Sequence, residues 1–363
     1  MSKFNEKEIR NKAIEYMEIY GMSRHEERVA SKLKASLKDA GVDYERDNLG
    51  SIIFKKTNSN KGPKILIATH MDEVGFVVQQ ILDNGQLLLS MVGGVWPNIA
   101  IGSVAKVYVD EQRQYTGVFG HTSIHILEPE ARSKAVPVKE LFVDCGFNSK
   151  QQAIDLGIEI GTEVYMEGPT LNFYDENYIV GKAVDNRVSV AVLDLLIHSL
   201  KDKVIPNQTY FAATVQEEVG LRGAKTVVSK VKPDIGIVID TTTSHDTYKC
   251  PEGDTKLNDG VCIRIKDGGT LVNPKLVKYF EELAIKHNIP LYKYVARGGG
   301  TDAEELQYGP NGGVLTIGLS IPQRYLHAPI GVATVKDIKA AFDLVREFLE
   351  VFDENEFEKV KFK

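Results

Sequence analysis

Short apolar runs alternate with longer amphipathic stretches through the second half of the chain, and this alternation constrains the fold more than any other feature. Apolar residues recur every three to four positions in a helix and fill brief continuous runs in a buried strand. On these criteria the predicted helices are 188–200, 223–230, 274–287 and 335–352, and the predicted strands are 210–215, 235–240 and 313–319. Strands that alternate with helices pack as one sheet covered by helices. We therefore expect an α/β fold with a helix-flanked mixed sheet.

The first 70 residues predict two helices followed by two strands. Helices 6–20 and 26–40 are separated by Gly21-Met22-Ser23-Arg24. Strands 51–54 and 64–69 flank a polar turn at residues 58–62. That spacing suits a hairpin or two neighbouring strands of the sheet.

The pattern changes between residues 75 and 167, where short alternating segments are punctuated by Gly and Pro. Segments 103–109 and 162–166 are typical of this region, which indicates a small β-rich, barrel-like domain. A chain of 363 residues also exceeds the usual size of one domain. We expect a discontinuous main domain, residues 1–74 and 168–363, interrupted by a β-rich domain at 75–167.

Charge and composition narrow the range of partners. The net charge is −6 and no long basic block occurs, which argues against nucleic acids and membrane surfaces. The opening residues lack the apolar core of a secretion signal, and no apolar run could cross a bilayer, so we expect a cytoplasmic protein. Cys145, Cys250 and Cys262 have no close paired spacing, which predicts reduced thiols rather than disulfides or a thiolate zinc site.

Several imidazole and carboxylate side chains stand where predicted strands end or helices begin. In open α/β sheets, ligands bind at the carboxyl edge of the strands. The residues at such positions are His70, Asp185, Glu217, Glu218, Asp240 and His327. Singly, each has an ordinary interpretation: a structural histidine, a solvated Glu pair, a turn or a helix cap. Their joint occurrence at separate strand ends and helix starts favours one shared site.

Nitrogen and oxygen ligands of this kind suit two divalent cations, with zinc, cobalt or manganese as candidates. Asp185 is the candidate for the ligand that bridges both ions. Glu218 and His327 would complete the ligands of one ion, and His70 and Asp240 those of the other. In two-metal hydrolases the ions lie about 3.5–4 Å apart.

Two further carboxylates have predicted catalytic roles. Glu217 is next to a ligand but directs its side chain differently, so it is the candidate general base for a water whose pKa a metal lowers to about 7. Asp72, two residues from His70, would accept the second N–H of that imidazole and fix its tautomer.

The glycine-rich segment 298–303 is the candidate for contact with a substrate. It lacks the Lys-Ser/Thr ending of a nucleotide-binding loop, so Gly299 and Gly300 fit a close backbone approach to a substrate better. Arg297, just before them, is a candidate contact for an acidic group, although a solvated arginine is the ordinary alternative.

Several blocks of the sequence resemble, in the same order, those of a known enzyme family. These blocks are His70-Met71-Asp72-Glu73-Val74-Gly75-Phe76, Gly181-Lys182-Ala183-Val184-Asp185-Asn186-Arg187, Glu217-Glu218-Val219-Gly220-Leu221-Arg222-Gly223-Ala224, Gly299-Gly300-Thr301-Asp302-Ala303 and Arg324-Tyr325-Leu326-His327. Over nearly the whole chain the sequence resembles the dinuclear-metal aminopeptidases that assemble as tetrahedral dodecamers, which include glutamyl aminopeptidases. Gly117-Val118-Phe119-Gly120, with His125 close behind, resembles a block of that family's inserted dimerisation domain.

The resemblance implies the same ligand and base roles as the residues themselves suggest, in a catalytic main domain. It also implies action on the free N-terminus of short peptides, inside a hollow homo-oligomer that is a dodecamer built from dimers. With Arg297 and Lys249 as candidate contacts, we lean towards Glu or Asp as the N-terminal residue removed; Leu remains an alternative, as does a simple dimer.

Two other functions stay open on the sequence alone. Paired carboxylates also cleave glycosidic bonds, so an endoglucanase-like glycoside hydrolase is one alternative. A non-catalytic scaffold, in which metal ions only hold loops together, is the other. The two histidines favour the metallo-aminopeptidase, because glycoside hydrolysis does not need them.

Overall fold

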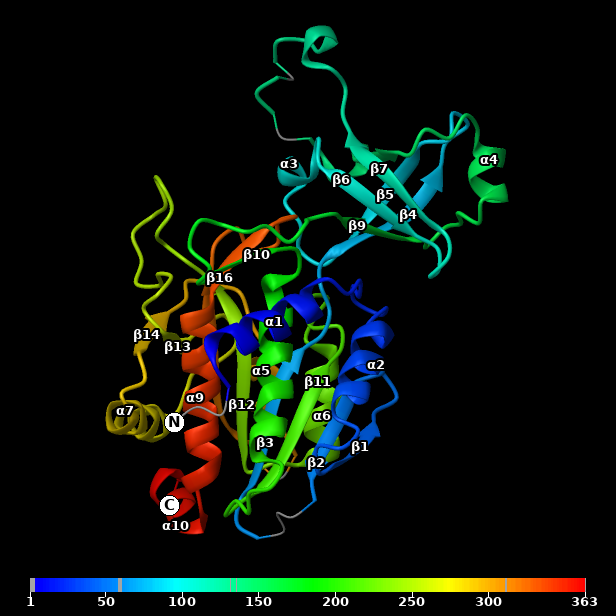
Figure 1. Cartoon of the computed structure of the whole chain (residues 1–363). Helices are drawn as coiled ribbons and strands as arrows, with labels where there is room; N and C mark the ends of the chain where they lie inside the picture. Colours follow the sequence, from blue (N-terminus) through cyan, green and yellow to red (C-terminus); the bar gives the residue numbers. More distant parts are fainter. Residues whose placement is uncertain (1–3, 58–60, 131, 135, 311, 363) are drawn as a thin grey trace.

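The computed structural model describes residues 4–57, 61–130, 132–134, 136–310 and 312–362. It consists of a large α/β unit and a smaller β-barrel that stands at one end of it (Figure 1). The predicted fold class is confirmed, because a helix-flanked mixed sheet and a β-rich insertion are both present. The exact domain limits, 74/75 and 167/168, stay a prediction.

One eight-stranded sheet forms the centre of the α/β unit. In spatial order its strands are β1 (Val42–Arg46), β2 (Ile52–Lys56), β11 (Gln208–Thr214), β3 (Lys64–His70), β12 (Ile235–Thr243), β15 (Leu315–Gln323), β13 (Val261–Lys266) and β14 (Leu291–Val295). Strands β11, β3, β12 and β15 run parallel, whereas β1, β2 and β13 introduce antiparallel pairs. The parallel strands place their carboxyl ends at one edge of the sheet.

The sequence predicted strands 51–54 and 64–69, which correspond to β2 and β3, as a hairpin or as neighbours in the sheet. This expectation is wrong. β11 lies between β2 and β3, pairing antiparallel with the former and parallel with the latter. Residues 58–60 of the predicted turn lie outside the described residues. A local polar turn is compatible with either arrangement, so only the long-range pairing of β11 decides between them.

Helices cover both faces of the sheet, as the nearly continuous burial of its central strands β3, β12 and β15 requires. The longer helices are α1 (Glu6–Met17), α2 (Glu27–Ser36), α5 (Val184–Leu200), α6 (Arg222–Val231), α7 (Pro274–His287) and α9 (Val335–Val351). In β3, Ile65 and Ile67 pack in the core with α1, α5 and α9. Leu66 and Ala68 of the same strand pack on the opposite face, in the core that α6 shares.

The inserted unit is a closed antiparallel barrel with a core of its own. Around the barrel the strands are β4 (Gly75–Ile81), β5 (Leu87–Val92), β8 (Phe142–Asp144), β7 (Gln114–Gly120), β6 (Val104–Tyr108) and β9 (Glu163–Met166). Alternate residues point inwards, so Phe76 and Val78 of β4 are buried with Val164 of β9. Closure satisfies every strand edge of this small sheet.

Small elements complete the chain: α3 (Pro97–Ala100), η1 (Ile124–Ile126), η2 (Val138–Glu140), α4 (Lys150–Asp155), β10 (Tyr178–Gly181), α8 (Ala303–Leu306), β16 (Gly331–Thr334) and α10 (Glu354–Val360). β10 and β16 form a separate two-stranded sheet. All three cysteines are free, as predicted. Within the described ranges, no helix is both long enough and apolar enough to span a membrane.

Candidate metal centre

The predicted site residues converge at the carboxyl edge of the parallel strands. His70 ends β3, Asp240 lies in β12, and the Glu217–Glu218 pair follows β11 directly. The parallel register places Thr214 opposite His70 and so aligns two of these strand ends. Asp185, in the first turn of α5, and His327, in the loop after β15, join them from the helix layer and the neighbouring strand.

The two carboxylate oxygens of Asp185 face two different histidines. His70 Nε2 lies 3.2 Å from Asp185 Oδ1 and 3.4 Å from Asp240 Oδ1. His327 Nε2 lies 3.3 Å from Asp185 Oδ2 and 3.3 Å from Glu218 Oε2. The ligand atoms of each group, His70 with Asp185 and Asp240, and His327 with Asp185 and Glu218, lie within 4.8 Å of one another. Asp185 is therefore common to two adjoining sets of potential ligands.

Burial and charge at this centre fit divalent cations. Four carboxylates, Asp185, Glu217, Glu218 and Asp240, stand against only two imidazoles, His70 and His327. Burial, reinforced by the charge of Asp185, raises the pKa of Glu218 to about 8. Burial alone would lower the pKa of His327, but Asp185 and Glu218 raise it to about 9. Both pKa values are raised, as neighbouring negative charge requires, and a bound cation would neutralise that charge.

A second observation supports the same conclusion. The Oδ1 atom of Asp185 is buried and accepts no hydrogen bond. A buried carboxylate oxygen without a donor is costly unless another partner compensates it. A cation between Asp185, His70 and Asp240 would supply that partner, and the oxygen and nitrogen donors are those that zinc, cobalt and manganese accept.

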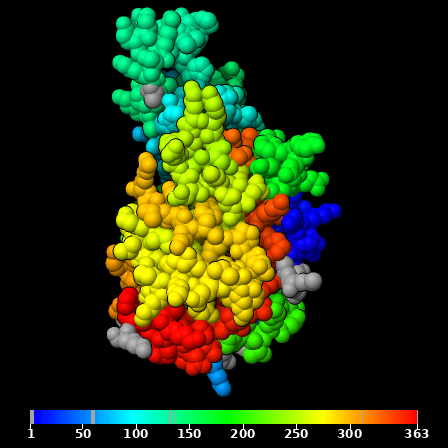
Figure 2. Space-filling view, turned by 90° about the vertical axis from the view of Figure 1, so that its left-hand side faces the viewer, coloured from blue at the N-terminus to red at the C-terminus, as the bar shows by residue number. Residues whose placement is uncertain are grey.

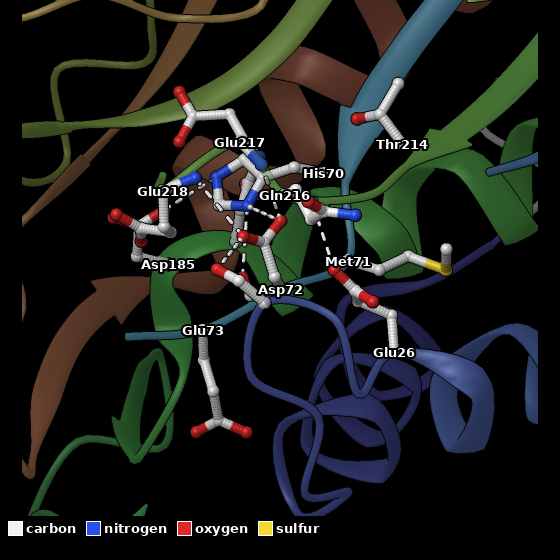
Figure 3. Close-up of polar contacts among 12 residues, drawn as sticks. Glu26, His70, Met71, Asp72, Glu73, Asp185, Thr214, Gln216, Glu217 and Glu218 are labelled. Carbon is white, nitrogen blue, oxygen red and sulfur yellow. Dashed lines mark hydrogen bonds and ion pairs between the residues drawn. The ribbon is translucent and has the colours of Figure 1, made fainter. Parts of the chain in front are cut away.

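The turn after β11 gives Glu217 and Glu218 separate directions. Gln216 has a φ of +57°, a left-handed conformation that costs a non-glycine residue about 1–3 kcal/mol. Figure 3 shows the two glutamate side chains leaving this turn in different directions. Glu217 also belongs to a third group of potential ligand atoms, with His70 and Glu218. Burial raises the pKa of Glu217 well above its usual value.

The structure modifies the predicted role of Asp72. His70 Nδ1 lies 3.1 Å from the Asp72 backbone carbonyl oxygen and 3.5 Å from its Oδ1 atom, so the backbone is the nearer partner of the imidazole. The Asp72 carboxylate instead accepts the backbone N–H groups of Glu217, at 3.0 Å, and Glu218, at 3.2 Å. It also accepts the Ser23 hydroxyl at 2.6 Å. Asp72 therefore orients the two glutamates as well as the histidine.

A cavity of about 690 Å³ opens above the centre. Its lining includes the ligand candidates together with Arg264, Arg297 and Gly298–Gly300. The candidate substrate contacts Arg297, Gly299 and Gly300 thus line the same cavity as the ligand candidates, whereas Lys249 is not among its lining residues. Figure 2 shows the yellow-green segment after β12 rising over this side of the α/β unit towards the barrel.

Sequence reasoning missed the buried charges beneath the centre. Lys182 Nζ lies 2.8 Å from Glu73 Oε1, and the buried Arg187 donates to the same oxygen at 3.2 Å. Burial lowers the pKa of Lys182 to about 8, although Glu73 opposes this. Both basic residues stand close to Asp185 in the sequence, but nothing in the local pattern indicated that they are buried.

The comparison with known proteins identifies the class of protein that fits this fold and this cluster of potential ligands. The profile described as M42 glutamyl aminopeptidase matches residues 50–344, and the chain belongs to this metal-dependent family of peptide hydrolases. Membership decides against the glycoside hydrolase and the non-catalytic scaffold that the sequence had left open.

Curated relatives match over almost their whole length. A putative aminopeptidase of Acetivibrio thermocellus is 34% identical, over 91% of this chain and 94% of its own. The glutamyl aminopeptidase of Lactococcus lactis is 29% identical, with coverages of 95% and 96%. The lysyl aminopeptidase of Pyrococcus furiosus is 31% identical, with coverages of 86% and 88%. The glutamyl and the lysyl aminopeptidase are thus about equally similar to this chain, although their names give substrate residues of opposite charge.

Solved structures share the fold throughout. The TET aminopeptidase of Thaumarchaeota archaeon SCGC AB-539-E09 superposes with a TM-score of 0.92, at 31% identity, covering 97% of this chain and all of that one. The TET1 peptidase of Pyrococcus horikoshii gives a TM-score of 0.85 at 28% identity, with coverages of 95% and 100%. The latter is described as assembling into a tetrahedron or a large octahedral shell.

Proposed function

We propose that this protein is a dinuclear metallo-aminopeptidase that removes N-terminal residues from short peptides. The observation that carries the proposal is the sharing of Asp185 between two sets of buried ligand atoms. His70 and Asp240 would complete one cation site, and Glu218 and His327 the other. Zinc or cobalt is the proposed occupant, and manganese offers similar ligand chemistry.

The residues divide the chemistry among them. Two divalent cations, when bound, lower the pKa of a water to about 7 and polarise the scissile carbonyl. Glu217 is the proposed base: it takes the proton of the attacking water and returns it to the leaving amine. The hydrogen bond that the Glu217 backbone N–H donates to the Asp72 carboxylate holds Glu217 for this transfer.

The part of the cavity lined by Arg264, Arg297 and Gly298–Gly300 would receive the substrate's N-terminal side chain. Arg297 and Arg264 bring positive charge to it, while Gly299 and Gly300 allow the substrate backbone to approach closely. Glu252 and Glu304 line the same cavity and partly offset that positive charge. A modest preference for Glu or Asp over Leu follows, because Arg297 can pair with a carboxylate, whereas Arg264 already pairs with Asp267 at 3.4 Å.

Assembly into a homo-oligomer is also proposed, with the barrel as the dimer contact and a dodecamer as the complete shell. The support is the close match of this chain to a peptidase that forms such shells. Analytical ultracentrifugation separates the dodecamer from a dimer, and a monomer at micromolar concentration would contradict the proposal.

The function is tested by adding zinc, cobalt or manganese separately to the metal-stripped protein and following the cleavage of Glu-, Asp- and Leu-arylamides. Glu217→Gln should reduce turnover by a factor of about 10² or more, the scale of lost general-base catalysis, with metal content unchanged. Glu282→Gln, on the exposed face of α7, is the matched control and should retain full activity. Turnover retained by Glu217→Gln would contradict the assigned base, and no cleavage with any cation would contradict the function.

A further inference from the structure

Three successive backbone N–H groups at the catalytic turn are each bound by a carboxylate from elsewhere in the fold. Asp72 accepts those of Glu217 and Glu218, as described above. The third, the N–H of Gln216, donates to Oε1 of Glu26 at 2.9 Å. Successive N–H groups of a turn form a natural anion-binding concavity. Figure 3 shows Glu26 approaching Gln216 from the segment before α2.

Glu26 stands where an ordinary helix-capping residue would be expected, yet it does not act as one. It is the N-cap of α2, but its side chain makes no capping hydrogen bond to that helix. Its Oε1 atom instead accepts both the Gln216 N–H and, at 2.9 Å, the Arg24 N–H. The Glu26 side chain therefore links the loop before α2 to the turn after β11 through hydrogen bonds.

The position of Glu26 makes this link hard to replace by solvent. The residue is only 4% exposed, and Gln216 only 6%. A buried N–H that loses its acceptor carries the full desolvation penalty. The left-handed Gln216 needs such external support, because the turn does not adopt its φ of +57° without cost.

The same loop makes a second link to the catalytic turn. Ser23 donates to the Asp72 carboxylate, which in turn holds Glu217 and Glu218. The segment Ser23–Glu26 thus supports the turn in two ways. Glu26 accepts one N–H of the turn itself, whereas Ser23 binds Asp72, which accepts the other two. No ligand candidate lies in this segment, so its contribution is to geometry rather than to metal binding.

We propose that Glu26 is a positioning residue of the active site, which fixes the Gln216–Glu218 turn and thereby the direction of Glu217. Only the expected effect on catalysis rests on the proposed function; the structural role of Glu26 does not. A displaced base slows the chemical step, and a misplacement of about 1 Å can cost about 10²-fold in rate. Substrate binding at Arg297, Gly299 and Gly300, none of which Glu26 contacts through a hydrogen bond, should be unaffected.

The test compares Glu26→Met, which keeps the side-chain length but removes the acceptor, with Glu26→Gln, whose amide oxygen can accept both N–H groups. Burial, with a smaller effect of Asp72, raises the pKa of Glu26 to about 7, so the neutral amide is a close substitute. Glu27→Gln is the control; Glu27 is the exposed neighbour that pairs with Arg46. If Glu26→Met does not fold, the smaller Glu26→Ala replaces it.

The first measurement is amide hydrogen exchange of the segment 214–220, which does not depend on activity. Exchange there should accelerate at least about tenfold in Glu26→Met and stay as in the unaltered protein in Glu26→Gln and Glu27→Gln. The second is arylamide turnover with cobalt added: Glu26→Met should lose about tenfold or more in kcat with KM within about twofold, and Glu26→Gln should recover it.

The outcomes separate the two proposals. An unaltered protein that cleaves no arylamide contradicts the proposed function, while accelerated exchange at 214–220 still supports the role of Glu26. Unchanged exchange in Glu26→Met overturns the positioning role whatever the activity. Accelerated exchange with an unchanged kcat overturns its consequence for Glu217, and failure of Glu26→Gln to restore kcat shows that the acceptor oxygen is not what matters.

Discussion

Replacing Arg187 should destabilise the protein more than any exposed substitution, because its guanidinium joins the segments beneath the site. The side chain is fully buried. Its hydrogen bonds go to Met71 O at 2.6 Å, Tyr16 O at 3.0 Å, Ile19 O at 2.6 Å, Gly21 O at 2.9 Å and Glu73 Oε1 at 3.2 Å. Arg187→Met retains most of the volume but none of these five bonds.

The expected loss in the free energy of unfolding depends on which of the five acceptors keep another hydrogen-bond donor. Lys182 still donates to Glu73 and to Ile19 O, and the Glu73 N–H still donates to Gly21 O. The Met71 carbonyl loses the Arg187 Nε donor at 2.6 Å. Removing one partner of a buried ionic network costs about 3–5 kcal/mol, and the surviving donors place Arg187→Met near the lower end, at about 3 kcal/mol. Arg187→Lys keeps the charge and should lose about 2 kcal/mol.

Urea unfolding followed by far-ultraviolet circular dichroism measures these losses at a fixed protein and metal concentration. The matched control is Arg113→Met on the barrel, where the arginine side chain is 51% exposed and pairs with Asp110. Its loss should be much smaller than that of Arg187→Met, because an exposed ion pair contributes little to stability. Equal losses for the two variants would refute the reasoning, since buried and exposed arginines would then contribute alike.

Three further predictions concern acid, metal and the core. Hydrogen bonds from Arg324 and Ser244 outweigh burial and lower the pKa of Asp246 from 3.8 to about 2, so its stabilisation is present above pH 4 and is lost as the pH falls towards 2. Because the pair is partly exposed, Asp246→Asn should cost about 1 kcal/mol at pH 7 and nearly nothing at pH 2, as judged from urea midpoints at both pH values; an equal loss at both would contradict this. Chelation should lower the melting temperature and re-addition of zinc or cobalt should restore it, since a cation at 100 times its Kd stabilises the native state by about 2.7 kcal/mol; an unchanged melting temperature would argue against bound cations. Phe348→Ala in α9 should cost about 3–5 kcal/mol in urea unfolding, because that ring is fully buried and stacks on Phe280 at 4.8 Å and Phe352 at 4.4 Å; a loss under about 1 kcal/mol would show that the stack adds little.

Much of the fold was readable because its signals are local. The predicted strand 64–69 and helix 335–352 match β3 and α9 to within one residue at each end, since long apolar periods leave little ambiguity. Strands β13 and β14 were missed. β14 is largely exposed, so its sequence Leu291-Tyr292-Lys293-Tyr294-Val295 lacks a continuous apolar run. β13 ends in Arg264 and Lys266, and its polar residues hide the buried half of the strand.

The candidate site likewise has features that local sequence signals predict and features that they do not. Residue type and position at strand ends were enough to nominate His70, Asp185, Glu217, Glu218 and Asp240, and the structure brings them together with His327; their individual roles remain proposals. The partners of Asp72 could not be foreseen, because its carboxylate meets the turn after β11, which lies about 145 positions further along the chain. Glu26 had only the appearance of a helix start, and its acceptor role depends on the same long-range approach.

The sequence by itself therefore determined most of the longer helices and several of the strands, which side chains could bind a cation, and that a β-rich insertion interrupts the α/β unit. Those properties depend on spacing within a few residues. Only the tertiary structure decided that β11 separates β2 from β3, that the insertion closes into a barrel, and that Glu26 and Asp72 accept the N–H groups of the turn after β11 while Arg187 joins the segments beneath it. Each of these depends on contacts between residues far apart in the chain, and local periodicity contains no information about which distant backbone groups will meet.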